Sequence, residues 1–350
     1  MTTERKVLEL MGAPGSPYTR KMLAVLRFRN IPYRLEHLAN IPGSVLDRHR
    51  KKRPQPKIPL QPTFYFQDEK GEEIAVTDSS PLIRRFEKEY EGRAIIPGDP
   101  ALAFIDMLLE DYSDEWLTKA MFHYRWAYEA DIEKAGCILA HWNAVSQPEE
   151  TIDQIANFIS ERQISRLPYV GSNEVTKPVI EESFKRFIHL LDQHLTAYPF
   201  LMGERPGSAD FATYGQLTCL ALFDPTPQAI ILQECPRVYA WVGVMEDLSG
   251  YRVENEDWLD MDNPPESLKN ILVEVGRIYA PYLLGNAKAV MEKAEKLEMT
   301  LDGKPWVQNP FSYQAKCLQW LREAYEALGE DDRSRVNQIL EGTGVLQLFA

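Results

Sequence analysis

The stretch Gly12-Ala13-Pro14-Gly15-Ser16-Pro17-Tyr18-Thr19-Arg20-Lys21 decides the fold at the amino end of this chain. It follows a short apolar run at 7–11, and its glycines and prolines are typical of the end of a strand. Ser16 suits the N-cap of a helix, and Pro17 suits its first turn, where a missing N–H costs nothing. Apolar residues then recur at helical spacing as far as Asn30. The sequence therefore predicts a strand, a tight loop and a helix that starts at a hydroxyl group.

The start of that helix is a candidate anion site. A helix amino terminus carries unpaired N–H groups and a partial positive charge, which favour a carboxylate or a thiolate. The Ser16 hydroxyl can donate a hydrogen bond into such a site while it accepts one from the helix backbone. Capping is the common use of such a serine. Two interpretations of Ser16 therefore stay open at this point, a plain helix cap and a donor to a bound anion.

The segments up to residue 90 predict a small sheet with helices on its faces. Residues 31–38 form a second strand with Pro32 at its start, and 58–66 and 73–76 form a hairpin around a Gly-containing turn. Thr77-Asp78-Ser79-Ser80-Pro81 then starts another helix. The basic run Asp47–Arg53 is expected on a solvated surface, with contact to a ligand carboxylate as the alternative.

The pattern changes after a Gly/Pro-containing linker at 92–99. Apolar residues recur at helical steps from Ile105 to His123, and further helices are expected at about 150–165 and 178–197. We expect three units: an α/β domain at 1–92, an all-helical domain at 98–250 and a mainly helical extension at 251–350. In the extension, 266–297 has a helical pattern, 299–307 predicts a hairpin at an Asp-Gly turn, and two helices follow at 312–328 and about 331–341.

Composition excludes several classes of function. With 52 acidic and 39 basic residues, the net charge of −13 disfavours nucleic acids and anionic membranes as partners. No apolar run is long enough to span a bilayer and no secretion signal is seen at the start, so a cytoplasmic protein is expected. The four cysteines show no paired spacing, which predicts reduced thiols, and the histidines form no metal-ligand motif. No cysteine precedes Cys137, so the first loop has no thiol for disulfide exchange.

The order of elements and three short motifs resemble the glutathione S-transferase family over about residues 5–250. The resemblance implies a thioredoxin-like amino-terminal domain that binds glutathione, followed by an all-α domain; residues 251–350 lie outside it. The stretch from Ser16 to Lys21 is similar to the serine-type catalytic loop of the family. The segment from Pro59 to Pro62 resembles the strand entry where the family keeps a cis-proline, and its spacing to the hairpin favours Pro62 over Pro59.

The resemblance also implies roles for the residues that bind glutathione. The backbone of Gln61, before Pro62, would hold the cysteinyl part of glutathione. Asp78 would pair with the ammonium of the γ-glutamyl end, and Ser79 with the following helix N–H groups would receive its carboxylate. Taken in isolation, Asp78-Ser79-Ser80 would be a simple helix cap.

A third motif, Pro199 to Phe211, is similar to the loop and buried helix start of the family's second domain. The family has Ser or Thr three residues before Asp210, where this chain has Gly207. Either Gly207 caps the helix, without the bond that a cap side chain would accept, or Ser208 caps it with shifted geometry. In both cases Asp210 is expected to be structural.

The implied reaction is attack of the glutathione thiolate on a small hydrophobic electrophile, with glutathione as co-substrate and no metal. Ser16 is the favoured donor to the sulfur and Tyr18 the alternative. Tyr112, Trp116 and His123 on the long helix are candidates for the substrate wall. The resemblance implies a homodimer. A non-catalytic binding or scaffold protein with the same fold is the second hypothesis. The extension is expected to pack on the helical domain; a sharper alternative has it covering the cleft or part of the dimer surface.

Overall fold

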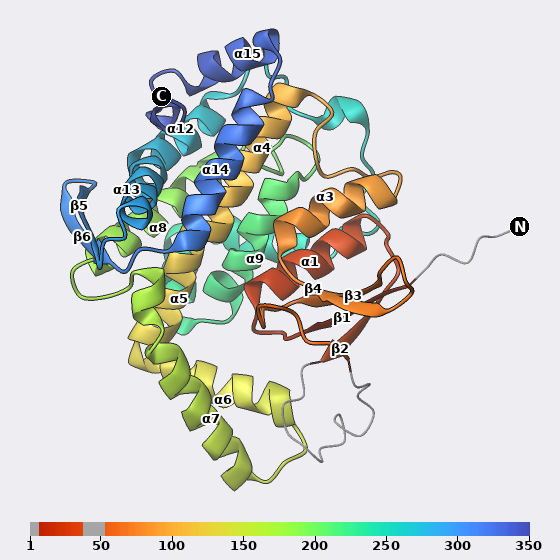
Figure 1. The fold of residues 1–350 in the computed structure, drawn as a ribbon, viewed down its shortest axis with the longest axis vertical. Helices are drawn as coiled ribbons and strands as arrows, with labels where there is room; N and C mark the ends of the chain where they lie inside the picture. The colour runs from red at the N-terminus through yellow and green to blue at the C-terminus, as the bar shows by residue number, and fades with distance from the viewer. Residues whose placement is uncertain (1–6, 38–52) are drawn as a thin grey trace, which may run out of the picture.

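A four-stranded mixed sheet forms the amino-terminal domain (Figure 1). The computed structural model describes residues 7–37 and 53–350. The sheet order is β2-β1-β3-β4: β1 (Leu8–Gly12) runs parallel to β2 (Tyr33–His37) and antiparallel to β3 (Thr63–Gln67), which pairs with β4 (Glu73–Val76). Helices α1 (Pro17–Phe28) and α3 (Ser79–Glu89) complete the domain. This confirms the expected thioredoxin-like arrangement.

One long helix with an interruption opens the helical domain. It consists of α4 (Pro100–Tyr112), the wide π turn η1 (Ser113–Leu117) and α5 (Thr118–Ala127). Figure 1 shows the hairpin of α6 and α7 projecting from the body at the bottom of the view. The remaining elements are α6 (Glu129–Ala144), α7 (Glu149–Ile164), η2 (Leu167–Val170), α8 (Lys177–His194), α9 (Ser208–Leu222), α10 (Pro225–Glu234) and α11 (Pro236–Met245). The expectation of an all-helical second domain is confirmed.

The last hundred residues pack against the helical domain. Figure 1 shows α14 and α15, drawn in blue, beside α4. The elements are η3 (Asn255–Asp257), α12 (Glu266–Glu274), the π turn η4 (Val275–Tyr279), α13 (Ala280–Met291), β5 (Leu297–Leu301), β6 (Lys304–Gln308), α14 (Ser312–Glu326), α15 (Glu330–Leu340) and η5 (Val345–Leu348). The pair of β5 and β6 confirms the hairpin predicted at 299–307. The helical pattern at 266–297 was expected without a break, but it holds a π turn, ends at Met291 and gives way to β5.

The two domains meet where α1 packs on α9. Helix α9 is buried along almost its whole length, and Gly215 on it lies against the turn of α1 at Pro17. A Cβ built on Gly215 would lie 2.8 Å from the carbonyl oxygen of Pro17 and 3.0 Å from Cβ of Lys21. The absence of a side chain at position 215 therefore allows the two helices to approach closely.

Two further expectations concern regions outside this core. Most of the basic run Asp47–Arg53 lies outside the described residues. Arg53 is described, and it is buried against Glu9, Glu36 and Glu73, which corrects its expected place on a solvated surface.

Within residues 7–37 and 53–350, no helix combines the length and the apolar character that a membrane span requires. We keep 1–92, 98–250 and 251–350 as a proposed division into domains.

Candidate active site

The loop before α1 places Ser16 between its own helix and Gln61. Ser16 is the N-cap of α1, and its Oγ accepts a hydrogen bond from the Thr19 N–H at 3.2 Å. The same hydroxyl donates to the Gln61 carbonyl oxygen at 3.5 Å. Helix α5 holds the loop from the other domain, because Arg125 Nη1 donates to the Gly15 carbonyl oxygen at 2.9 Å. Ser16 is thus a cap whose oxygen also faces the strand entry.

The strand entry has the expected backbone form. The peptide bond between Gln61 and Pro62 is cis, which confirms the choice of Pro62 over Pro59. Gln61 and Pro62 both line a large cavity between the two domains and the extension. Ser16 is not among the lining residues, and it meets the cavity wall through its contact with Gln61.

The start of α3 contributes Asp78 and Ser79 to the same cavity. Asp78 occupies the N-cap position with φ of 85°, a left-handed conformation that is uncommon for a residue other than glycine. Its side chain does not cap α3, and its Oδ2 instead accepts a hydrogen bond from the Tyr313 hydroxyl at 2.9 Å. Ser79 is buried, and its Oγ accepts from Lys21 Nζ at 3.2 Å.

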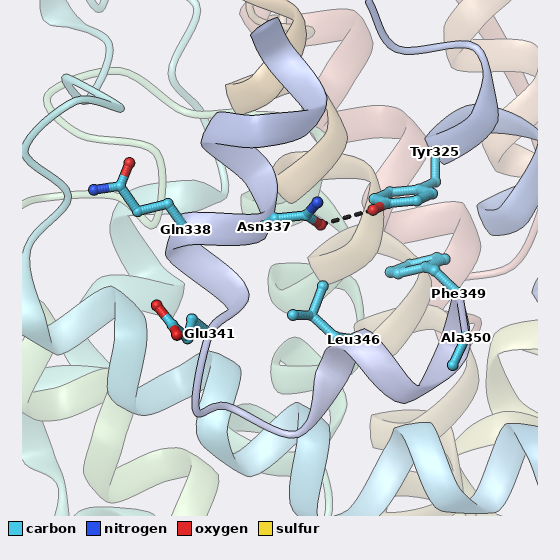
Figure 2. Close-up of a pocket in the computed structure, with 7 residues that line it drawn as sticks. All are labelled: Tyr325, Asn337, Gln338, Glu341, Leu346, Phe349 and Ala350. Carbon is cyan, nitrogen blue, oxygen red and sulfur yellow. Dashed lines mark hydrogen bonds between the residues drawn. The ribbon is translucent and has the colours of Figure 1, made fainter. Parts of the chain in front are cut away.

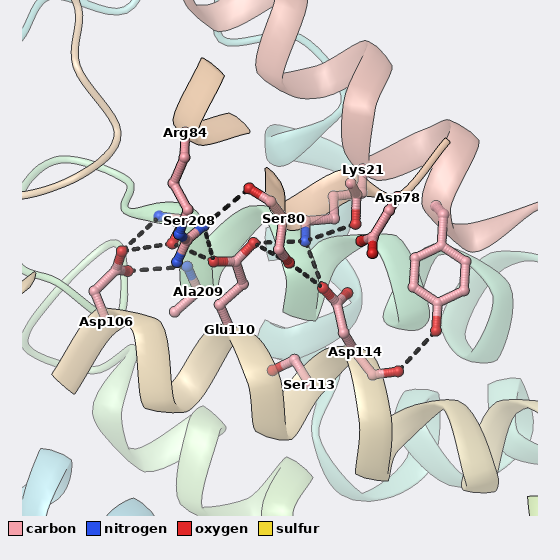
Figure 3. Close-up of polar contacts among 12 residues, drawn as sticks. Lys21, Asp78, Ser80, Arg84, Asp106, Glu110, Ser113, Asp114, Ser208 and Ala209 are labelled. Atoms are coloured by element: carbon pink, nitrogen blue, oxygen red, sulfur yellow. Dashed lines mark hydrogen bonds and ion pairs between the residues drawn. The ribbon is translucent and has the colours of Figure 1, made fainter. Parts of the chain in front are cut away.

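Lys21 is the centre of a buried polar network beneath the start of α3 (Figure 3). Its Nζ lies 2.8 Å from Glu110 Oε1 and 2.5 Å from Asp114 Oδ2, both on the long helix of the second domain. Ser80 Oγ donates to Glu110 Oε1 at 2.9 Å, and Arg84 Nη1 pairs with Glu110 Oε2 at 2.9 Å. The network therefore ties α1 and α3 to α4 and the π turn.

The charges of this network shift each other's pKa. Burial alone would raise the pKa of Glu110, but Arg84 and Lys21 outweigh it and hold that pKa well below its usual range. Burial alone would lower the pKa of Lys21, but Asp114 and Glu110 raise it. The Lys21–Glu110 pair is therefore ionised over the ordinary pH range. One oxygen of Asp114, Oδ1, has no hydrogen-bond partner among the described residues.

The cavity that these segments line has a volume of about 1770 Å³. Its far wall comes from the long helix and from α14 of the extension. Asp111 lines it and accepts a hydrogen bond from Tyr279 at 2.7 Å, while Glu115 lines it and accepts from Gln314 Nε2 at 2.9 Å. Burial raises the pKa of Asp111 to about 7, and burial together with the charge of Asp111 raises the pKa of Glu115 to about 8.

Tyr18, the alternative donor, faces the other domain. Its hydroxyl donates to the backbone carbonyl of Asp114 at 2.7 Å. Burial, followed by the charges of Glu115 and Asp114, raises its pKa well above the usual value. Tyr18 therefore lines the cavity with a hydroxyl that is already engaged.

The three residues expected on the substrate wall lie elsewhere, which corrects that expectation. Tyr112, Trp116 and His123 are buried, and none of them lines the cavity. Tyr112 packs on Phe187 and Tyr279, and Trp116 packs on Tyr282 and Trp306. His123 is bonded through Nδ1 to Ser172 at 2.8 Å and through Nε2 to Glu181 at 3.1 Å. The extension covers Tyr112 and Trp116, whereas His123 is enclosed by residues of the helical domain itself.

The start of α9 resolves the question of its cap. Gly207 takes the N-cap position, and its N–H donates to Asp210 Oδ2 at 2.9 Å. Asp210 Oδ1 accepts from the Leu201 N–H at 2.7 Å, so this carboxylate orders the loop, as expected of a structural residue. Ser208 instead donates to Asp106 at 2.6 Å and joins the buried network.

Two family models match the chain in the order of its domains. The glutathione S-transferase amino-terminal domain matches residues 10–94, and the glutathione S-transferase carboxyl-terminal domain matches residues 160–248. The chain belongs to the glutathione S-transferase family. The second match stops before the extension, so residues 251–350 are an addition to the parts that the family models cover.

Comparison with known proteins adds only distant likenesses to this family assignment. None of the curated proteins matches the chain. A glutathione S-transferase from Methylobacterium radiotolerans, in complex with glutathione sulfonate, is 14% identical, with 69% of this chain and 91% of that chain covered and a TM-score of 0.37. A glutathione transferase from Burkholderia graminis, with two glutathione molecules bound per subunit, is 12% identical, with 77% and 89% covered and a TM-score of 0.39. A glutathione S-transferase from Rhodospirillum rubrum is 14% identical, with 76% and 99% covered and a TM-score of 0.41.

Sequence analysis of this glutathione S-transferase family member missed the buried charges beneath α3. A signal was available, because Lys21 precedes Val25 by one helical turn and so lies on the apolar face of α1. Asp106, Glu110 and Asp114 likewise recur every fourth residue along α4 and into the π turn, among residues that are mostly apolar. A charge that recurs on a buried face requires a partner on the facing element.

Proposed function

We propose that this chain is a glutathione transferase that stabilises the glutathione thiolate with Ser16. The observation that carries the proposal is the meeting of separate segments: Ser16 contacts Gln61, and Gln61, Pro62, Asp78 and Ser79 line one cavity. These are the positions at which the sequence resembles the glutathione site of the family. Their convergence supports a glutathione site.

The chemistry follows from the start of α1. A free thiol has a pKa of about 8.5 and is mostly protonated at neutral pH. The Ser16 hydroxyl and the partial positive charge at the amino end of α1 would stabilise the thiolate and raise its reactive fraction. The thiolate sulfur then supplies the electron pair for a bond to the electrophilic carbon. The leaving group departs with the electron pair of the bond that breaks.

The other end of glutathione would lie at the start of α3. The Asp78 carboxylate suits the γ-glutamyl ammonium, while the first N–H groups of α3 suit the α-carboxylate. Ser79 Oγ already accepts from Lys21 and can still donate its own proton to that carboxylate. Lys21 thereby orients Ser79 from beneath.

The remaining space in the cavity would hold the electrophile. Phe122, Tyr169 and Trp320 supply an apolar wall, which supports a hydrophobic electrophile. Pockets for drug-sized ligands have volumes of about 300–1,000 Å³. A cavity of about 1770 Å³ leaves room for glutathione and an electrophile that is larger than the small one expected from the sequence.

Titration calorimetry with glutathione and the rate of conjugation to an activated aryl chloride test the proposal. Ser16→Ala is expected to move the pKa of the bound thiol toward about 8.5 and to lower kcat about 100-fold. Ser16→Thr keeps both the hydroxyl and the cap, so it serves as the matched control and should recover most of the rate. Glutathione bound without turnover on several electrophiles would favour the scaffold hypothesis, and a chain that neither binds glutathione nor speeds its attack on any electrophile would refute the transferase.

Two further parts of the proposal concern the cell and the assembly. We propose a homodimer, which light scattering on the purified chain tests, and a monomer at micromolar concentration would contradict it. We also propose a cytoplasmic location, which fractionation of the source cells tests. Recovery with the membrane or secreted fraction would contradict that location.

A further inference from the structure

Helix α14 of the extension forms a wall of the candidate active site. Phe311, Tyr313, Gln314, Cys317 and Trp320 line the same cavity as Asp78 and Gln61, although they follow the parts that the family models cover. The extension is therefore placed to do more than cover the helical domain.

The start of α14 is held firmly in this position. Asn286 on α13 clamps the backbone of Phe311, donating to its carbonyl oxygen at 2.8 Å and accepting from its N–H at 2.8 Å. Gln314 Nε2 donates to the Glu115 carboxylate at 2.9 Å and to the Glu115 carbonyl oxygen at 3.1 Å. The side chains of the first turn of α14 therefore have little freedom.

Between these anchors, Tyr313 reaches across to Asp78. Its hydroxyl donates to Asp78 Oδ2 at 2.9 Å, and its ring packs against Phe311 and Trp320 with centroid distances of 6.3 and 6.1 Å. Burial and the neighbouring Asp78 charge raise the pKa of Tyr313, so its hydroxyl stays protonated and acts as a donor. The contact joins the extension directly to the residue proposed to bind the glutathione ammonium.

The Asp78 side chain does not act as the cap of its own helix. With φ of 85° and no side-chain bond to the start of α3, its carboxylate is turned away from the cap role. Tyr313 supplies the one side-chain hydrogen bond recorded for this carboxylate among the described residues. Without that bond, the carboxylate could rotate about its side-chain torsions and sample several directions.

We propose that Tyr313 is a positioning residue of the glutathione site, which fixes one oxygen of Asp78 so that the other faces the ligand ammonium. This inference rests on the proposed function. A carboxylate accepts about four hydrogen bonds, so Tyr313 and the ammonium can both bind it. Tyr313 acts through Asp78 and touches no reacting atom. The extension thus completes the glutathione site instead of blocking it.

The test is titration calorimetry on the full chain with two ligands, glutathione and its analogue that lacks the γ-glutamyl amino group. Tyr313→Phe keeps the ring and removes the hydroxyl. It is expected to raise the Kd of glutathione about five-fold, as befits one lost hydrogen bond, and to leave the Kd of the amine-free analogue unchanged. Asp78→Asn should abolish the difference between the two ligands, with or without Tyr313→Phe.

Tyr325→Phe is the matched control, on the same helix. The Tyr325 hydroxyl donates to Asn337 Oδ1 at 2.7 Å in a separate surface pocket near the carboxyl end (Figure 2), and neither residue lines the cavity that contains Asp78. This control is expected to change neither Kd. Near-ultraviolet circular dichroism on each variant shows whether the aromatic packing survives.

The possible results distinguish a failure of the positioning role of Tyr313 from a failure of the proposed glutathione transferase function. Glutathione bound by Tyr313→Phe as tightly as by the wild type, or more tightly, overturns the positioning role; tighter binding would mean that Tyr313 competes with the ligand. An equal loss for both ligands would mean that Tyr313 is merely structural, and overturns it as well. A wild-type chain that binds no glutathione refutes the proposed function itself, and the inference with it.

Discussion

Lys21 Nζ on α1 lies 2.8 Å from Glu110 Oε1 on α4, and both side chains are buried between the two domains. The pair lies directly beneath Ser79, whose hydroxyl accepts from the same ammonium. Burial of two ions is costly, and only close pairing with further hydrogen bonds offsets that cost. The amino-terminal domain and the helical domain are therefore joined by charges at the point where the γ-glutamyl end of glutathione is proposed to bind.

Replacing Lys21 tests how much of the fold depends on this pair. Lys21→Met leaves Glu110 with Arg84 alone and Asp114 without its cation, so we expect a loss of about 3–5 kcal/mol in the free energy of unfolding. Urea unfolding followed by circular dichroism measures it. Lys288→Met on α13 is the control, because Lys288 forms an exposed ion pair with Glu292 and should change stability by at most about 1 kcal/mol. Equal effects of the two changes would contradict the prediction.

The pKa of Glu115 predicts a pH dependence of stability. That pKa is raised to about 8 in the folded chain by burial and by Asp111, against about 4.3 in an unfolded chain. Between these two values the folded state holds a proton that the unfolded state releases, so this group makes stability fall as pH rises, until the loss is complete above the folded pKa.

Glu115→Gln stays neutral and should remove this contribution. Relative to the wild type, the variant is expected to gain stability as pH rises from 5 to 8, by at most about 1.4 kcal/mol per pH unit. Urea unfolding at a series of pH values measures the gain. Glu298→Gln on β5, at an exposed position, should follow the wild-type curve. A gain that is the same at every pH would show that the charge of Glu115 is not the cause.

Removing the hydroxyl of Tyr18 tests whether Tyr18 or Ser16 donates the hydrogen bond to the glutathione sulfur. Tyr18→Phe removes the bond to the Asp114 carbonyl, and we expect a loss of about 1 kcal/mol in unfolding free energy. The Tyr18 hydroxyl donates at 2.7 Å, a closer bond than the 3.5 Å one from Ser16 to Gln61, so the pKa of the bound glutathione thiol should not change in Tyr18→Phe, in contrast to Ser16→Ala. The ultraviolet absorbance of the bound thiolate, titrated with pH, reports this pKa. A shift in Tyr18→Phe as large as in Ser16→Ala would make Tyr18 the donor.

The approach of α9 to α1 predicts a steric cost at Gly215. Gly215→Ala places a Cβ 2.8 Å from the Pro17 carbonyl oxygen, and we expect a loss of about 1–3 kcal/mol in unfolding free energy. Gly243→Ala on α11 is the matched control, because nothing lies within 4 Å of its Cβ. There the higher helix propensity of alanine should stabilise the chain by up to about 1 kcal/mol. Thermal unfolding of both variants gives the comparison, and a stabilised Gly215→Ala would refute the close contact.

Local patterns were enough to predict the helices and strands and the order of the site segments, whereas the thioredoxin-like arrangement came from the family resemblance. The cap at Ser16, the hairpin after Pro62 and the helix after Asp78 are each written in a few adjacent residues. The cis bond before Pro62 followed from a resemblance and not from the residues themselves. What these segments share is that their structure depends little on distant parts of the chain.

The partners of the site could not be predicted in this way. Tyr313 meets Asp78 across 235 positions of sequence, and no local pattern indicates such a contact. For the same reason Trp116 was expected in the cleft: its apolar face was recognised, but the extension that buries this face was not placed. Periodicity shows that a face is covered, whereas the fold decides what covers it.

The π turn at Ser113–Leu117 changes the phase of the long helix. A π turn contains one residue more than an α-helical turn, so everything after it is rotated by about 100° relative to an uninterrupted helix. Thr118, Lys119 and Phe122 lie beyond the turn and still face the cavity that Asp111 lines before it. Loss of a single residue here would restore a regular helix and turn those three side chains away. Which side chains of this helix line the cavity thus depends on the one additional residue in the π turn.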